Sequence, residues 1–368
     1  MKIRRIYIDA SAASDPVARE VCRRLELPAE HIGDPAELYK SLAGSADPES
    51  AGKSVLLLTR NKGPFIRNCP GTSHYTCCGY KILHVGAYCV MDCAYCILQA
   101  YYHPPVLQFF TNHDQMENEL EEFFSQRVTG RIGTGEFTDS LIWEPLYPLA
   151  EKLVHRFSLQ DTSVLELKTK TARVDGLPDS GHGTKTIVAW SLNTDHVIRN
   201  QERKTASLEA RIAAAEKCQA KGYRVAFHFD PMILYPGCHL EYASVVERLF
   251  ARIDPANIVW ISLGSFRFMP ELKDVTARRF PDSKIIYGEF IKGLDGKMRY
   301  FKPLRIRLYR RIINSIRERA PGVLIYFCME DHEVWQKALG FTPDLYGGLE
   351  RMLDRRAERM CGLCNTVL

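Results

Sequence analysis

Short apolar runs recur along this chain, and segments of helical periodicity separate most of them. From Lys81 onward the pattern predicts strands over 82–88, 131–135, 164–169, 187–193, 223–229 and 258–264. The clearest helix is predicted over 207–221, with Ser207 as its N-cap and an apolar stripe of Leu208, Ile212, Ala215 and Cys218. A charged amphipathic helix is expected around 114–127. Strands that alternate with helices predict a parallel sheet with right-handed crossovers.

Six such units are fewer than the eight of a closed barrel, so the expected fold is an α/β partial (β/α)6 TIM-like barrel. In barrels of this kind the chemistry gathers at the carboxyl ends of the strands. Polar residues stand at these ends in the sequence: Cys89, Glu136, Lys170, Ser191, Asn193, His228 and Asp230.

The remaining segments predict a unit on each side of the barrel. Residues 1–75 read as a small α/β domain, with strands at 3–8 and 54–59, a helix at 16–25, and a loop in the Ser/Ala/Gly-rich segment before Ser54. Residues 76–270 form the predicted barrel. Residues 271–368 are expected to be a C-terminal hairpin and helical extension with a CxxC tail.

Composition limits the class of protein. The chain has 368 residues, 46% hydrophobic and 25% charged, enough to bury a core in one large or two unequal domains. No apolar run reaches the length of a membrane span, and the start Met-Lys-Ile-Arg-Arg precedes no apolar segment. Twelve cysteines, three of them close together, fit a reducing compartment better than a disulfide framework. We therefore expect a cytoplasmic protein with no membrane partner.

A dense run of Lys and Arg lies between Lys292 and Arg319, although the net charge is only +5. Tyr300, Phe301 and Tyr309 interleave with it. Cations with aromatic rings between them are typical of a nucleic-acid surface. For 305–319 a solvated helix face remains an equal alternative.

The cysteines of Cys89-Val-Met-Asp-Cys93-Ala-Tyr-Cys96 predict the central chemistry. Three thiolates at this spacing can bind three irons of a [4Fe-4S] cluster and leave the fourth iron open for a ligand. A structural zinc site or buried free thiols are the alternatives. The CxxxCxxC spacing resembles that of the radical S-adenosylmethionine (SAM) superfamily. This resemblance implies that SAM binds the open iron and is cleaved to methionine and a 5′-deoxyadenosyl radical.

The polar strand ends then become candidate SAM ligands. Gly133-Thr134-Gly135-Glu136 resembles the Gly-Gly-Glu motif of that superfamily, with Glu136 on the ammonium group. Lys170 is expected to meet the SAM carboxylate. Ser191 and Asn193 are expected on the ribose or the methionine part. Arg211 either reaches the same carboxylate or forms a surface ion pair.

Other candidates keep two interpretations. Tyr95 either packs on the adenine or takes part in hydrogen-atom movement. His228 and Asp230 either bind SAM or substrate at the barrel mouth or, for His228, serve as a satisfied core group. Asp139 is expected to orient its neighbours. The remaining cysteines suggest a second metal site, a reducible pair or a loose tail: Cys69, Cys77, Cys78, Cys361 and Cys364.

Within the superfamily, the chain is similar to the spore photoproduct lyase family. The resemblance rests on segments 89–99, 167–175, 191–200 and 208–223 and on Arg267-Phe268. It implies direct repair of the methylene-bridged thymine dimer in UV-damaged DNA, by abstraction of a thymine C6 hydrogen and scission of the bridge. It also implies a hairpin near the lesion and an electron donor such as flavodoxin or ferredoxin. The DNA contacts expected from it are Arg267, Arg299, Tyr300 and Lys302.

Two positions depart from the family pattern. The family returns a hydrogen atom from a cysteine after the second strand, and 133–140 holds no cysteine, with Glu136 near that place. Ile97 replaces a second tyrosine. Either Tyr95 or an extra cysteine serves as donor, or the substrate is another lesion or a small molecule. A non-catalytic metal-cluster protein that binds nucleic acid is the third hypothesis.

Overall fold

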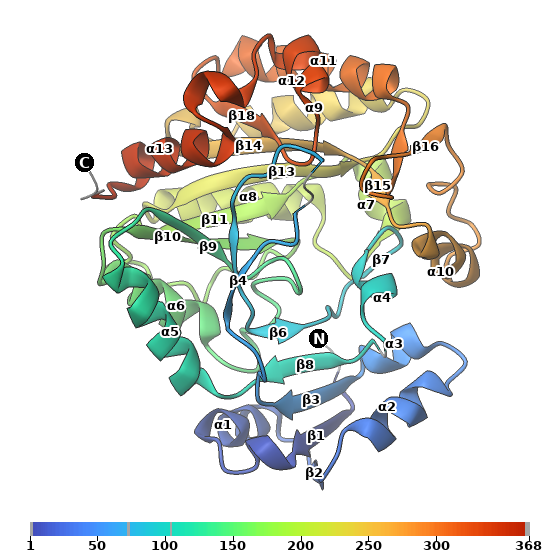
Figure 1. The fold of residues 1–368 in the computed structure, drawn as a ribbon, viewed down its shortest axis with the longest axis vertical. Helices are drawn as coiled ribbons and strands as arrows, with labels where there is room; N and C mark the ends of the chain where they lie inside the picture. Colours follow the sequence, from blue (N-terminus) through green and yellow to red (C-terminus); the bar gives the residue numbers. More distant parts are fainter. Residues whose placement is uncertain (1–2, 72–73, 104, 365–368) are drawn as a thin grey trace.

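The structure is a computed structural model that describes residues 3–71, 74–103 and 105–364. Its larger sheet has the order β18-β14-β13-β11-β10-β9-β5-β4 and curls into a partial barrel (Figure 1). Neighbours from β18 to β5 are parallel, and β4 pairs antiparallel with β5. The strands are β4 (Ile66–Asn68), β5 (Lys81–Leu83), β9 (Gly130–Gly133), β10 (Ser163–Thr169), β11 (Thr186–Ser191), β13 (Arg224–Met232), β14 (Ile258–Ser265) and β18 (Leu324–Phe327).

The predicted partial barrel is confirmed, with β18 as a further parallel strand in the segment expected to be a C-terminal extension. The barrel strands are apolar because both of their faces are covered. The helices that follow them are α5 (His113–Ser125), α6 (Leu149–Ser158), α7 (Asp195–Gln201), α8 (Leu208–Ala220) and α9 (Cys238–Phe250). Ser207 caps α8 as predicted, since its hydroxyl accepts a hydrogen bond from the amide of Ala210 at 3.2 Å.

The N-terminal residues form a second sheet of order β2-β1-β3-β8-β6, at the opposite end of the molecule from the last helices (Figure 1). It contains β1 (Arg5–Asp9), β2 (Ala29–Ile32), β3 (Val55–Thr59), β6 (Gly86–Ala87) and β8 (Leu107–Phe110), with α1 (Pro16–Leu25). The loop predicted in the Ser/Ala/Gly-rich segment before Ser54 is confirmed only over residues 44–47. The helices α2 (Ala36–Ala43) and α3 (Pro48–Gly52) take up the rest of that segment. Leu38 and Leu42 bury one face of α2, and the carboxylate of Asp47 accepts a hydrogen bond from the amide of Ser50 in α3.

The strand predicted over 82–88 is two strands. After β5 the chain leaves the barrel, and β6 pairs antiparallel with β8 of the N-terminal sheet. One hydrophobic core consequently includes Ile6 of the N-terminal sheet and Trp335 of the last helices. The cysteine loop follows directly after this crossing.

The open side of the barrel is closed by the segment before β5. The amide of Met329 donates to the carbonyl of Thr76 at 3.1 Å. The amide of Thr76 in turn donates to the carbonyl of Glu330 at 3.2 Å. Beside these bonds the sulfurs of Cys78 and Cys328 are 3.9 Å apart.

The C-terminal part adds three helices and a small antiparallel sheet. The helices are α11 (Lys302–Arg319), α12 (His332–Leu339) and α13 (Leu349–Cys361), and the sheet holds β15 (Arg267–Phe268), β16 (Phe290–Lys292) and β17 (Met298–Tyr300) beside α10 (Glu271–Arg279). No helix in the described ranges is long and apolar enough to cross a membrane.

The structure does not bring the tail cysteines to Cys77 or Cys78. Glu350, in the first turn of α13, faces Gly79. Cys361 ends that helix, about 16 Å further along at the usual rise per residue. There its carbonyl accepts a hydrogen bond from Lys185 at 2.8 Å. The predicted second metal site, shared by the tail cysteines with Cys77 or Cys78, therefore has no support in the structure.

Candidate active site

A cavity of about 630 Å³ opens at the carboxyl ends of the barrel strands. Its walls come from segments far apart in sequence, as expected for a barrel of this kind. The residues that matter below line it together: Cys89, Cys93, Tyr95, Cys96, Tyr101, Glu136, Asp139, Lys168, Lys170, Ser191, Asp230, Arg267 and Lys297.

The cysteine loop is held in shape by a short strand pairing and by the side chain of Gln99. Its β7 (Asp92–Cys93) pairs antiparallel with β12 (Glu202–Arg203), so that Cys93 lies opposite Glu202. The side-chain amide of Gln99 donates to the carbonyls of Cys93 and Cys96 at 2.9 and 3.3 Å. The three cysteines are free thiols, and burial raises the pKa of Cys89 to about 12. A bound metal would deprotonate such a thiol outright.

These thiols fit a cubane cluster with three protein ligands. All three face one cavity that has room for a further ligand. Among the described residues no three Cys, His, Asp or Glu side chains gather closely enough for a single metal ion. A cubane has a different requirement, because each thiolate binds a different iron at its own corner.

A buried ion-pair cluster anchors the loop from outside. The carboxylate of Asp92 accepts from Lys53 at 2.8 Å and from Arg279 at 3.0 Å. Thr276 donates to the carbonyl of Ala94 at 2.9 Å. The N-terminal unit and α10 therefore both position the cluster loop. No local pattern in the sequence marks Lys53, Thr276 or Arg279, since none of them lies in or beside the motif.

Glu202 is a further residue that sequence reasoning missed. Its carboxylate accepts hydrogen bonds from the Tyr95 hydroxyl and from Arg211, all of them buried. Burial alone would raise the pKa of Glu202, but the charges of Arg211 and Lys170 hold it below its usual range. The Tyr95 hydroxyl is thus occupied in holding the loop against β12.

The expected role of Arg211 at the SAM carboxylate is not supported by its position. Arg211 is fully buried and does not line the cavity. Besides Glu202, its guanidinium donates to the carbonyls of Ser191 and Ala206 at 2.8 and 3.0 Å and to Thr205. The alternative of a surface ion pair is also wrong, because the side chain has no exposure.

Asn193 and His228 are likewise used inside the protein and do not line the cavity. The amide of Asn193 donates to Pro231 at 2.8 Å and accepts from Tyr242 at 2.6 Å. His228 lies between Glu166 at 2.6 Å and Ser262 at 2.7 Å. The interpretation of His228 as a satisfied core group is the one that its contacts fit.

Lys170, Ser191 and Glu136 do meet at the cavity. The ammonium group of Lys170 lies 5.8 Å from the centre of the Tyr95 ring. Asp139 orients this corner as expected, because its carboxylate accepts from the amide of Lys170 at 2.7 Å and from the Thr169 hydroxyl at 2.8 Å. Burial raises the pKa of Asp139 in spite of these hydrogen bonds.

An ion pair and a further lysine also line the cavity. Arg267 donates to Asp230 at 3.1 and 3.2 Å. Lys168, which the sequence did not single out, lies among three carboxylates. Burial alone would lower its pKa, but Glu136, Glu166 and Asp230 hold it above the usual range. The cavity therefore combines cations and carboxylates, as a zwitterionic ligand requires.

Three of the four predicted DNA contacts are less accessible than expected. Arg299 is buried and donates to Asp295 at 2.7 Å and to the carbonyl of Met329. Tyr300 is buried, and its hydroxyl accepts from the amide of Leu234. Lys302 is at the surface but is paired with Asp331 and Glu333. Arg267 alone lines the cavity.

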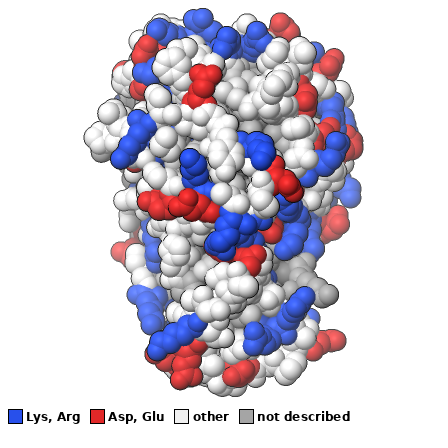
Figure 2. Space-filling model, turned by 90° about the vertical axis from the view of Figure 1, so that its right-hand side faces the viewer, with Lys and Arg blue, Asp and Glu red and all other residues white. Residues whose placement is uncertain are grey.

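The surface around α10 and β16 carries both signs of charge. Figure 2, which views this side of the molecule, shows Lys and Arg interspersed with Asp and Glu. No single-sign field covers this face.

A partial parallel barrel with three thiols facing the cavity at its strand ends is the arrangement of a radical SAM protein. A family model described as "Spore photoproduct lyase" matches residues 72–300. The chain therefore belongs to the spore photoproduct lyase family.

Individual relatives agree. The chain is 27% identical over 206 residues to spore photoproduct lyase of Bacillus subtilis (strain 168), covering 55% of this chain and 60% of that protein. It is 24% identical over 306 residues to that of Clostridium acetobutylicum, covering 81% and 87%. A solved mutant of spore photoproduct lyase with bound AdoMet and dinucleoside spore photoproduct superposes with a TM-score of 0.78 at 21% identity, covering 89% of this chain and 100% of that one. That likeness shows the fold.

Proposed function

We propose that this chain is a radical SAM lyase that repairs spore photoproduct, the methylene-bridged thymine dimer, in DNA. The observation that carries the proposal is that Cys89, Cys93 and Cys96 line one cavity. The same cavity is lined by Lys170 and Glu136, a cation and an anion that suit a zwitterionic ligand. Family membership supports it. A relative of the same fold has been solved with AdoMet and the dinucleoside lesion bound.

The three thiols would hold a [4Fe-4S] cluster. When bound together, the cluster and SAM supply a 5′-deoxyadenosyl radical that abstracts the C6 hydrogen of the lesion. Lys170 would pair with the SAM carboxylate and Glu136 with its ammonium group, because they are a cation and an anion that line the same cavity. Ser191 and Asp230 would contact the remaining polar groups of SAM or substrate.

Other residues would act by positioning. Asp139 fixes the backbone that carries Lys170. Glu202 and Arg211 hold the Tyr95 side of the cluster loop. Tyr95 would therefore serve mainly to shape the loop, with its ring beside Lys170. Arg267 and Lys297, on the same cavity wall, would meet phosphates of the lesion strand.

A second candidate is a radical SAM enzyme of this family that acts on a different lesion. One observation favours it: among the described residues that line the cavity, the thiols are the three of the cluster loop. Among the described residues, the cavity lining therefore holds no counterpart of the cysteine that returns a hydrogen atom to the product radical in the family. Tyr101 offers a phenol there and is more than half exposed.

We also propose that this protein is cytoplasmic and that it receives electrons from a flavodoxin or a ferredoxin. The low potential of many iron–sulfur clusters requires a donor of that class.

The test is an anaerobic turnover of reconstituted protein with SAM, a strong reductant and synthetic dinucleotide spore photoproduct. Restored thymine dinucleotide together with 5′-deoxyadenosine is expected. The variant with Cys89, Cys93 and Cys96 all changed to Ala should form neither product, whereas Cys22→Ala on α1, away from the cavity, should match the unchanged protein. Deoxyadenosine without restored thymines would reject this lesion and favour the second candidate.

A further inference from the structure

The structure divides the basic segment of the chain into an inner and an outer set. Arg305 is buried, and its guanidinium pairs with Glu330 at 3.0 Å. Arg307, Arg310 and Arg311 are exposed on the outer face of α11. The inner set stabilises the fold, so the outer set alone is available to a partner.

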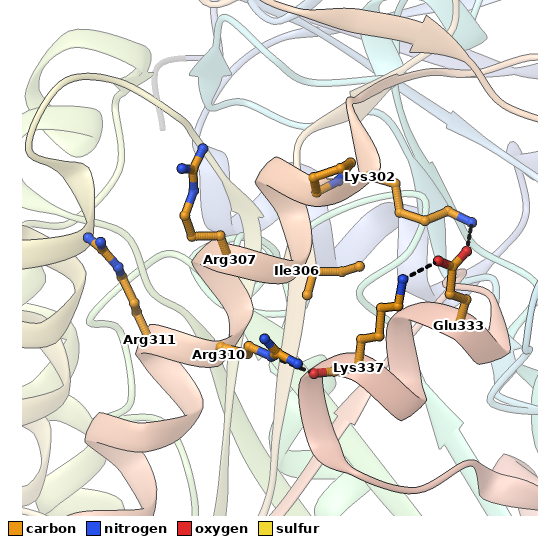
Figure 3. Close-up of a pocket in the computed structure, with 8 residues that line it drawn as sticks. Lys302, Ile306, Arg307, Arg310, Arg311, Glu333 and Lys337 are labelled. Carbon is orange, nitrogen blue, oxygen red and sulfur yellow. Dashed lines mark hydrogen bonds and ion pairs between the residues drawn. The ribbon is translucent and has the colours of Figure 1, made fainter.

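The outer set borders a groove of about 510 Å³ along α11 and α12. Figure 3 shows how its side chains lie around Ile306. Five cations and one carboxylate line it: Lys302, Arg307, Arg310, Arg311, Lys337 and Glu333. Lys302 and Lys337 both bind Glu333 at 2.7 Å, so the carboxylate is already engaged.

Arg307 and Arg311 are both exposed, and among the described residues neither guanidinium makes a hydrogen bond or an ion pair. Both side chains extend from α11 on the side away from α12 (Figure 3). They stand four residues apart, where like charges destabilise a helix. Two uncompensated arginines at that spacing are therefore a cost to the helix that an anionic partner would remove.

The start of α11 is joined to the small sheet beside the cavity. Lys302 begins α11 two residues after β17, and β17 pairs with β15, whose Arg267 and Phe268 line the cavity. A lesion held in the cavity must leave the duplex stack, and its flanking duplex remains outside. A duplex that leaves the cavity along β15 and β17 would reach the start of α11.

We propose that this groove binds the phosphodiester backbone of the duplex that flanks the lesion. The inference rests on the proposed function and names a surface outside the cavity. Guanidinium groups match phosphate oxygens, and the floor of Pro303 and Ile306 offers no polar group to a base. The contact is therefore independent of sequence and serves to position the duplex.

The test compares Arg307→Gln/Arg311→Gln with Arg355→Gln/Arg359→Gln. The control pair is also exposed and four residues apart, on α13. Binding to a labelled undamaged duplex is measured over a range of KCl concentrations. Loss of two phosphate contacts should reduce the slope of log K against log salt by about 1.8, at about 0.9 per contact. The control pair should leave the slope unchanged, and Arg307→Lys/Arg311→Lys should largely retain it.

Turnover of the dinucleotide separates this inference from the proposed function. A dinucleotide has no flanking backbone, so all four proteins should process it equally if they are active on it. An unchanged salt slope in the Gln pair, or an equal loss in the α13 pair, would overturn the inference whatever the dinucleotide result. Competition by an acidic polypeptide but not by duplex would overturn it as well.

Discussion

Replacing Arg211 by Met should destabilise the fold and loosen the cluster loop, although Arg211 does not touch the cavity. The side chains of Arg211 and Glu202 are 0% and 1% exposed. The substitution removes the counter-charge in direct contact with Glu202 and the donors to Ser191 and Ala206. Breaking one side of a buried ion pair costs roughly 3–5 kcal/mol, because the other charge stays buried without compensation.

The assay is urea unfolding of the metal-free chain, followed by circular dichroism. Arg248→Met is the matched control, because Arg248 pairs with Asp195 at the surface, at 35% and 49% exposure. It should lose far less stability. Adding Glu202→Gln to Arg211→Met should restore part of the loss, since the unpaired charge is then gone. A loss no larger than that of Arg248→Met would refute the reasoning.

Single substitutions at Asp92, Lys170 and His84 test three other parts of the structure. Asp92→Asn leaves Lys53 and Arg279 without their shared carboxylate, so the reconstituted protein should lose iron to a chelator faster than the unchanged one. Lys170→Gln should weaken SAM binding roughly tenfold or more in an equilibrium binding assay, as expected for a lost hydrogen bond to a charged group. The control Lys217→Gln, on the outside of α8, should leave SAM binding unchanged. Burial between Phe110 and Phe137 lowers the pKa of His84 to about 3, and its ring nitrogens have no partner among the described residues. Below about pH 6.5 the imidazole of His84 therefore binds a proton in the unfolded chain but not in the folded one. The free energy of unfolding should fall by roughly 2 kcal/mol between pH 7 and pH 5 for this reason. In unfolding titrations His84→Phe should lack this pH-dependent loss.

The barrel strands could be predicted because each is a short apolar run followed by polar residues. The exceptions have physical reasons. Residues 82–88 look like one strand, yet the chain changes sheets between β5 and β6, and side-chain pattern does not record which neighbour a strand finds. The strand β18 was missed because it follows a long basic helix in a segment with no further repeat.

At the site, residues adjacent in sequence were easier to assign than residues that meet only in the fold. The cysteine spacing pointed to its chemistry directly. The positions of Arg211 and His228 depended on Glu202 and Glu166, which no motif marks. A polar residue at a strand end can face the cavity or the barrel wall, and a partner distant in sequence decides which.

The most direct test of the account is a turnover with spore photoproduct that carries deuterium at the thymine C6 position. If the cavity presents this lesion to the radical derived from SAM, deuterium should appear in 5′-deoxyadenosine while thymines are restored. Deoxyadenosine that forms without deuterium, with the lesion intact, would contradict the account.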